Sequence, residues 1–174
     1  KAQLITTVAL NEQKLVRRYK SDTCSLYVSI PFCPTRCAYC SFVSYATPRL
    51  LSMIPDYLER LKADIAETVK IIKEKGKRIV TVYLGGGTPT TLNEAQLEDL
   101  LSFIGTQIDP AGLAEYTVEG GRPDTITPKK LSVAVNCGVS RISINPQTLN
   151  EDILKSIGRK HSADDFFRAY YQAR

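Results

Sequence analysis

Short runs of apolar and β-branched residues recur along the chain and predict four β-strands. Val, Ile, Tyr and Thr dominate these runs, as is typical of strands that bury at least one face. The predicted strands cover residues 25–30, 79–84, 116–119 and 141–144.

Apolar residues spaced by three and four positions predict a helix after each of these strands. Asn93 suits an N-cap, Pro128 suits a first helical position, and Gly76 is a stop signal after the clearest pattern. The helices are expected at residues 55–74, 93–104, 128–137 and 162–170.

The order of strand and then helix, repeated four times, predicts an α/β fold with a parallel sheet. Closed barrels of this kind have about eight βα units. We therefore expect residues 21–174 to form the N-terminal portion of a barrel core, as an open half-barrel without its later strands. Residues 1–20 have some helical character from residue 8 onward and no initiator Met, so we expect a lead-in from an upstream region.

The unusual residues of the chain follow the predicted strands. These segments are PFCPTRCAYC after the first strand, GGGTPT after the second, Glu119 with GGRP at the end of the third, and NPQT after the fourth. The carboxyl ends of parallel strands meet at one edge of a sheet, where ligands bind. The sequence therefore predicts one site built from four strand ends.

Composition narrows the function classes only slightly. The apolar content of 43% is ordinary for a folded domain, and the net charge of +5 comes from scattered basic residues. Such a distribution predicts no nucleic-acid partner. No apolar run approaches the roughly 20 residues that span a bilayer, and the start lacks a signal-peptide pattern. We expect a cytoplasmic protein without a membrane partner.

Three of the five cysteines, Cys33, Cys37 and Cys40, lie close together in the first loop. This spacing is a poor layout for disulfides in a reducing compartment. Three thiolates can hold three corners of a 4Fe-4S cluster and leave its fourth iron open. The alternatives are a closed structural cluster and zinc, which normally needs a fourth Cys or His. Cys24 and Cys137 are expected to be small buried apolar residues.

The other loops contain groups that suit S-adenosylmethionine (SAM), whose amino and carboxylate groups can chelate an open iron. Glycines 85–87 remove side chains where the backbone must approach a ligand, and Thr88 adds a hydroxyl. A charged Glu119 is costly to bury alone, so a ribose or sulfonium partner is expected, or else an ion pair with Arg122. Gln147 could bond the nucleoside or stabilise its own loop.

CPTRCAYC matches the CxxxCxxC signature of radical SAM enzymes, and the wider context YVSIPFCPTRCAYCSF with YLGGGTPT is more specific. It resembles the oxygen-independent coproporphyrinogen III dehydrogenase (oxidase) family from about residue 26 to residue 174. TVEGGRPDTIT and RISINPQTLNEDILKSIGRKH look most like its HemZ-like branch. The resemblance implies the N-terminal part of a partial, TIM-like (βα)6 barrel.

The resemblance also implies a role for each matching residue. Cys33, Cys37 and Cys40 match the cluster ligands. Polar, aromatic and glycine contacts to SAM match Tyr27, Gly86, Gly87, Thr88, Glu119, Gln147 and Arg159, whereas Tyr39 matches an aromatic residue near a second SAM. Without the resemblance, Arg159 is interpreted as a surface charge. No protein side chain is assigned a catalytic role of its own.

The chemistry implied by the resemblance belongs mainly to the cofactors. Reduced flavodoxin or ferredoxin supplies an electron, and SAM is cleaved into methionine and a 5′-deoxyadenosyl radical. The radical then removes a hydrogen atom from a propionate, and loss of carbon dioxide and one electron leaves a vinyl group. Two such events convert coproporphyrinogen III into protoporphyrinogen IX. We expect residues 1–174 alone to turn over poorly.

One departure from the family pattern concerns the residues after Cys40. The dehydrogenases have a fourth cysteine two residues further on, whereas this chain has Ser41 and Phe42. The CxF ending is found in the related haem chaperones, which keep the cluster and carry haem. The alternative function is therefore a haem-binding chaperone without dehydrogenase activity.

Overall fold

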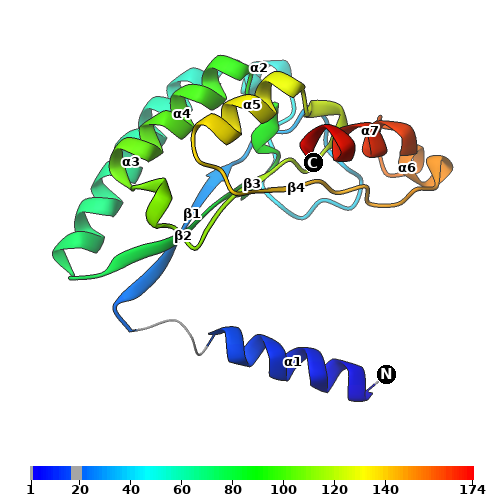
Figure 1. Cartoon of the computed structure of the whole chain (residues 1–174). Helices are drawn as coiled ribbons and strands as arrows, with labels where there is room; N and C mark the ends of the chain where they lie inside the picture. Colours follow the sequence, from blue (N-terminus) through cyan, green and yellow to red (C-terminus); the bar gives the residue numbers. More distant parts are fainter. Residues whose placement is uncertain (1, 17–20) are drawn as a thin grey trace.

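The computed structural model describes residues 2–16 and 21–174, and its centre is a four-stranded parallel sheet (Figure 1). The strands lie in sequence order across the sheet. They are β1 (Thr23–Ile30), β2 (Arg78–Gly86), β3 (Glu115–Glu119) and β4 (Arg141–Ser143). The predicted α/β fold is confirmed, and each strand starts or ends within two residues of its expected bounds.

Three long helices lie together on one face of the sheet: α3 (Ile54–Glu74), α4 (Glu94–Gln107) and α5 (Pro128–Asn136) (Figure 1). The fourth expected helix is α7 (Ala163–Ala173). The sequence analysis missed several short elements. These are α2 (Pro48–Leu51), α6 (Glu151–Ser156) and the 3-10 turns η1 (Pro89–Thr91), η2 (Pro110–Gly112) and η3 (Pro123–Thr125).

The helix boundaries follow from local hydrogen bonds. Asn93 forms a capping box at the start of α4, in which its side chain accepts from the Gln96 N–H. Ser162 forms the same arrangement at the start of α7, and the Thr127 side chain caps α5. Gly76 has a φ of 66°, a left-handed conformation that suits the end of α3. The helix starts and stops are thus encoded by residues beside them.

Alternating residues of β1 face opposite sides of the sheet. Leu26, Val28 and Ile30 are buried, whereas Tyr27 and Ser29 between them are exposed. The buried side chains pack with apolar residues of the covering helices, among them Leu58, Ile65, Val69, Leu97, Leu100, Leu101, Ile104 and Val133. Burying this apolar surface stabilises the fold by about 25 cal/mol per Å². The opposite face of the sheet keeps polar and aromatic side chains.

Helix α1 (Ala2–Val16) precedes the sheet, within the predicted lead-in. Helical character was expected from residue 8 to residue 19, and residues 17–20 lie outside the described part of the chain. Ile5, Val8 and Leu10 of α1 are exposed. No helix in the described ranges is both long enough and apolar enough to cross a membrane.

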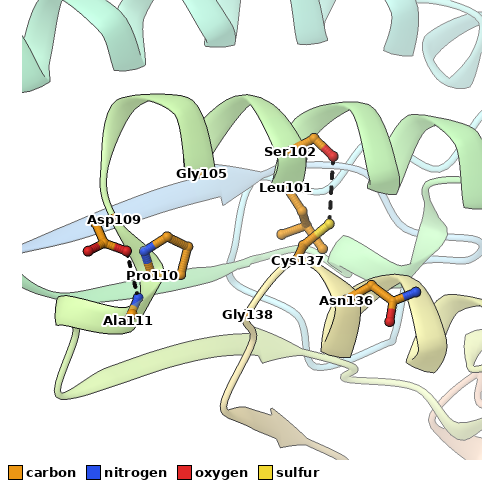
Figure 2. Close-up of a pocket in the computed structure, with 9 residues that line it drawn as sticks. All are labelled: Leu101, Ser102, Gly105, Asp109, Pro110, Ala111, Asn136, Cys137 and Gly138. Carbon is orange, nitrogen blue, oxygen red and sulfur yellow. Dashed lines mark hydrogen bonds between the residues drawn. The ribbon is translucent and has the colours of Figure 1, made fainter.

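A crevice of about 530 Å³ lies between α4, η2 and the end of α5 (Figure 2). The segments around η2 and after α5 lead into β3 and β4, so the crevice lies at the amino-terminal edge of the sheet. Cys137 lines it, with its Sγ 3.6 Å from the Ser102 Oγ. Cys137 and Cys24 are only partly buried. Their expected full burial was wrong in degree, because each thiol lies beside polar atoms near the protein surface.

Candidate functional site

The carboxyl ends of the strands meet at a smaller cavity of about 180 Å³. Residues from all four strand-end loops line it, as the strand and helix order predicts. The lining residues are Cys33, Cys37, Tyr39, Cys40, Phe42, Gly86, Gly87, Thr88, Glu119, Gly121, Arg122, Asn145, Gln147 and Arg159. The structure therefore brings together all three clustered cysteines and every predicted cofactor contact except Tyr27.

The cysteine loop between β1 and α2 is held at both sides by backbone hydrogen bonds. The N–H of Cys33 donates to the Tyr45 carbonyl at 3.0 Å, and the N–H of Tyr45 donates to Pro31 at 2.7 Å. Across the cavity, the N–H of Ala38 donates to the Ile157 carbonyl at 3.0 Å. These bonds fix the backbone on which the three cysteines stand, so a long loop can present them in a defined arrangement.

Each thiol of the cluster motif has a different neighbour. The Cys33 Sγ lies 3.3 Å from the Thr88 hydroxyl, and the Cys37 Sγ accepts a hydrogen bond from the Arg122 guanidinium at 3.1 Å. Cys40 is less buried and its Sγ lies 3.9 Å from the Phe42 carbonyl. Burial raises the pKa of the Cys33 thiol, while the Thr88 hydroxyl and the Arg122 charge act in the opposite direction.

The spacing of these thiols bears on the kind of metal site they could form. Within residues 2–16 and 21–174, no three His, Cys, Asp or Glu side chains converge on one metal position. A 4Fe-4S cluster distributes its thiolates over different irons, so its ligands do not need to converge. His161, the histidine that a zinc site would need, lies outside the cavity with its Nε2 3.1 Å from the Pro146 carbonyl.

Gly86 and Gly87 line the cavity, but their immediate neighbours belong to the protein itself. A Cβ at Gly87 would lie 2.8 Å from the Phe32 carbonyl oxygen and 3.0 Å from the Cys33 Sγ. A Cβ at Gly86, where φ is 105°, would lie 2.7 Å from the Ser29 Oγ. These contacts are closer than side chains tolerate. The glycines therefore let the end of β2 pass directly against β1 and the start of the cysteine loop, a reason that the sequence analysis did not foresee.

Glu119 extends from the end of β3 into the same cavity. Burial raises the pKa of its carboxyl group, and a hydrogen bond from the Gly86 N–H only partly offsets this effect. The alternative of an ion pair with Arg122 is wrong, because Arg122 directs its guanidinium to the Thr35 carbonyl and the Cys37 thiol. Glu119 therefore has a carboxyl group with a raised pKa at a cavity wall, which makes it a candidate functional residue.

Arg159 is buried, so its interpretation as a surface charge is wrong. It is 9% exposed and donates to the Gly121 carbonyl at 3.0 Å and to the Tyr39 hydroxyl at 3.3 Å. Its Nε is buried without a partner. Gln147 lies on the adjacent loop with a φ of 60°, and its N–H donates to the Asn145 Oδ1 at 2.9 Å. Both residues line the same cavity and supply polar groups to its wall.

Tyr27 lies outside the cavity, on the open face of the sheet. Its ring stacks on Tyr83 with 5.8 Å between the ring centroids, and it is 58% exposed. A Cβ built on Gly85 would lie 2.8 Å from the Tyr27 hydroxyl and 2.9 Å from the Glu119 Oε2, so both groups lie beside Gly85. Tyr27 therefore adjoins the cavity through Glu119.

Four lining residues were not assigned to the site from the sequence: Phe42, Gly121, Arg122 and Asn145. Arg122 was considered only as a partner for Glu119. The position of GGRP directly after a strand was the available signal, since strand ends of a parallel sheet share one edge. That position predicts that the loop lies at the site, but it does not predict which of its side chains point into the cavity.

The chemistry of the cavity walls fits a cluster with thiolate ligands. Two buried arginines, Arg122 and Arg159, line the cavity with the thiols, and each has a buried nitrogen without a hydrogen-bond partner. Buried cations favour nearby thiolates and anionic ligands. Three thiols, two cations and one carboxylate thus meet in a small cavity.

Residues 27–174 match the family model of the radical SAM superfamily. The chain belongs to this superfamily. Within it, the radical SAM chain is 38% identical over 154 residues to the oxygen-independent coproporphyrinogen-III oxidase-like protein HemZ of Bacillus subtilis, covering 88% of this chain and 31% of HemZ. It is 36% identical over 151 residues to the heme chaperone HemW of the same organism, covering 86% of this chain and 38% of HemW.

A solved structure supports the same placement. The coproporphyrinogen III oxidase HemN from Escherichia coli, a radical SAM enzyme, superposes with a TM-score of 0.77 at 28% identity. The match covers 92% of this chain and 36% of HemN. The chain spans about a third of the length of these relatives. It is a HemN/HemZ-like radical SAM chain with part of the TIM-like barrel.

Proposed function

We propose that Cys33, Cys37 and Cys40 bind a 4Fe-4S cluster, and that the full protein decarboxylates coproporphyrinogen III oxidatively to protoporphyrinogen IX without oxygen. The observation that carries the proposal is one cavity lined by these three cysteines, the glycine turn and polar residues from the other strand ends. The names of the relatives HemZ and HemN support the substrate. On this proposal, residues 21–174 are part of the radical SAM core and residues 1–20 are a lead-in.

The cavity walls would hold and orient SAM. Gly86 and Gly87 offer backbone without side chains beside the cysteine loop, and the Thr88 hydroxyl lies 3.3 Å from the Cys33 Sγ. The Glu119 carboxylate suits ribose hydroxyls or the sulfonium. Gln147 and Arg159 would supply further polar contacts.

Two tyrosines complete the proposed contacts. The Tyr39 hydroxyl bonds to Arg159 at the cavity wall, where a second SAM would lie. Tyr27 adjoins Glu119 on the open sheet face and would contact the first SAM from that side. When bound, the cluster and SAM supply a 5′-deoxyadenosyl radical after one-electron reduction by flavodoxin or ferredoxin. The protein's part is to position the ligands and exclude competing reactions.

The direct test uses the full-length protein with a reconstituted cluster under anaerobic conditions. Incubation with coproporphyrinogen III, dithionite and SAM should yield 5′-deoxyadenosine and a product with vinyl groups. A Cys33→Ala variant serves as the control and should yield neither. 5′-Deoxyadenosine without a vinyl product would contradict the substrate, and absence of 5′-deoxyadenosine would contradict the radical chemistry.

A haem chaperone is the second candidate function. It is favoured by Phe42, which stands where the dehydrogenases have a fourth cysteine and is 67% exposed beside the cavity. Relatives named heme chaperone HemW also match over more than four-fifths of this chain. Added haem would then give a Soret band and pass to an apo-haemoprotein. Haem transfer without vinyl product from coproporphyrinogen III would favour this candidate over the dehydrogenase.

A further inference from the structure

Arg122 is a buried cation in the loop after β3. Its side chain crosses to the cysteine loop, and the residue is only 1% exposed. Burying a charge is costly unless the charge is paired and hydrogen-bonded. The buried guanidinium of Arg122 therefore needs a negatively charged or strongly hydrogen-bonding partner.

The partners of Arg122 among the described residues do not include a carboxylate. Its Nη2 donates to the Thr35 carbonyl at 2.8 Å and to the Cys37 Sγ at 3.1 Å, and its Nη1 is buried without a partner. A neutral carbonyl compensates a guanidinium only weakly. A cysteine thiolate would form a charge-assisted hydrogen bond, which is roughly twice as strong as a neutral one.

We propose that Arg122 is a positioning residue that holds the Cys37 sulfur and raises the reduction potential of the cluster. This inference rests on the proposed cluster at Cys33, Cys37 and Cys40. Reduction adds a negative charge to the cluster, so a nearby cation and a hydrogen bond to a ligating sulfur favour the reduced state. Burial strengthens both effects, because the surroundings screen charge less than water does.

Arg159 provides a matched comparison within the same cavity. It is also a buried arginine with an unpartnered nitrogen, but it donates to the Gly121 carbonyl and the Tyr39 hydroxyl rather than to a thiol. Replacing Arg159 removes a cavity charge without removing a hydrogen bond to sulfur. The two arginines therefore separate the effect of a sulfur hydrogen bond from that of charge alone.

The experiment measures the cluster potential of the full-length protein by EPR-monitored redox titration, without SAM. The variants are Arg122→Gln, Arg122→Lys and Arg159→Gln, each checked for iron and sulfide content. We expect Arg122→Gln to shift the equilibrium between reduced and oxidised cluster about tenfold toward the oxidised form, or about 59 mV for one electron. Arg122→Lys, which keeps a charge but not the planar fork, should shift it less, and Arg159→Gln should shift it less than Arg122→Gln.

A second measurement is the Fe–S(Cys) stretching frequency by resonance Raman spectroscopy, which should rise when the hydrogen bond to the Cys37 sulfur is lost. An unchanged potential in Arg122→Gln with full iron content would overturn the proposal. If that variant does not fold, an unchanged potential in Arg122→Met, which also lacks the charge and the N–H donors, would overturn it. Folded variants that hold no cluster would show a purely structural role and also overturn it. If the wild-type protein binds no cluster, the proposed function itself fails.

Discussion

The crevice and the cysteine cavity lie at opposite edges of the sheet and differ in the charged groups that line them, which their volumes do not show. The crevice of Figure 2, at the amino-terminal edge, measures about 530 Å³, whereas the cysteine cavity measures about 180 Å³. In the crevice, Asp109 accepts a hydrogen bond from the Ala111 N–H, and Ser102 lies against Cys137. In the cysteine cavity, Arg122 and Arg159 keep buried nitrogens without partners. Buried cations with unpartnered nitrogens, rather than volume, distinguish the candidate site.

The fold explains this difference. The loops at the amino-terminal edge connect helices back to strands. Many of their backbone N–H groups donate to carbonyls of the same turn. The loops at the carboxyl-terminal edge follow the strands and converge, so this edge is where ligands bind in parallel α/β folds. The cost of unpaired buried groups is about 1–3 kcal/mol each, and it is tolerated where a ligand compensates for it. The following variants test that contrast by making matched changes at the two edges.

The largest effect is expected from removing a thiol. Cys37→Ala should abolish cluster binding and 5′-deoxyadenosine formation, because three thiolates are the proposed ligands. The control is Cys137→Ala in the crevice, which should keep full iron content and lose about 1 kcal/mol of stability or less. Iron and sulfide analysis with urea unfolding measures both. Equal iron loss in the two variants would contradict the proposal that the cluster binds only at the carboxyl-terminal edge of the sheet.

Glycine substitutions should have the next largest effect. Gly87→Ala places a Cβ against the Phe32 carbonyl and the Cys33 Sγ, so we expect iron content or SAM affinity to fall about tenfold or more. Gly138→Ala, in the crevice, combines a φ of 83° with a Cβ 2.7 Å from Pro110. It should cost about 1–3 kcal/mol of stability but leave cluster binding intact. A Gly87→Ala protein with wild-type iron content and SAM affinity would show that this close approach is not needed.

A moderate effect is expected at Glu119. Glu119→Gln should weaken SAM binding about tenfold, as expected for losing a hydrogen bond to a charged group. The control is Glu115→Gln at the other end of β3, where the carboxylate pairs with Arg141 outside the cavity. That variant should bind SAM normally. Isothermal titration of the cluster-loaded protein measures both affinities, and equal losses would contradict a specific role for Glu119.

Glu119→Gln, which should weaken SAM binding, should increase the stability of the cluster-free protein. Because burial raises the pKa of Glu119 in the folded state, its ionised form costs stability at neutral pH. That cost disappears as pH falls below the unfolded-state pKa of about 4.3. The cluster-free Glu119→Gln protein should therefore be more stable at pH ~7 by less than about 1 kcal/mol, and the gain should vanish near pH ~4. A gain that grows toward acid pH would contradict this sign.

The smallest effect is expected from Ser102→Ala in the crevice. This change removes a weak contact of 3.6 Å with the Cys137 Sγ. Stability should change by less than about 0.5 kcal/mol and iron content should not change. Urea midpoints and iron analysis are sufficient to check it, and a loss of iron would connect the crevice to the site.

Much of the fold could be predicted because its signals are local. The alternating burial in β1 and the capping residue Asn93 are encoded by neighbouring positions, and the structure follows them closely. Helices α2 and α6 were missed because four to six residues are too few for a helical period to be recognised. The repeated strand and helix pattern predicted a parallel sheet, whereas the order of the strands across it came from the structure.

The candidate site was only partly predictable. The spacing of the cysteines and the glycines after β2 identified the loops, and the parallel arrangement of the predicted strands indicated that the loops converge. Arg159 was assigned to the site only through a family resemblance, since its burial depends on the loops around it. The ion pair considered as an alternative for Arg122 was wrong, because its neighbours lie 85 and 87 positions earlier in the chain.

The sequence by itself therefore determined which residue types stand at the strand ends and in which order those ends appear. Tertiary structure decided which side chains are buried, which thiol receives the Arg122 hydrogen bond, and that Tyr27 lies on the sheet face outside the cavity. The physical reason is the distance along the sequence over which each interaction acts. Periodicity and capping act between residues a few positions apart, whereas hydrogen bonds and burial in the cavity depend on atoms that only packing of distant loops brings within about 3 Å.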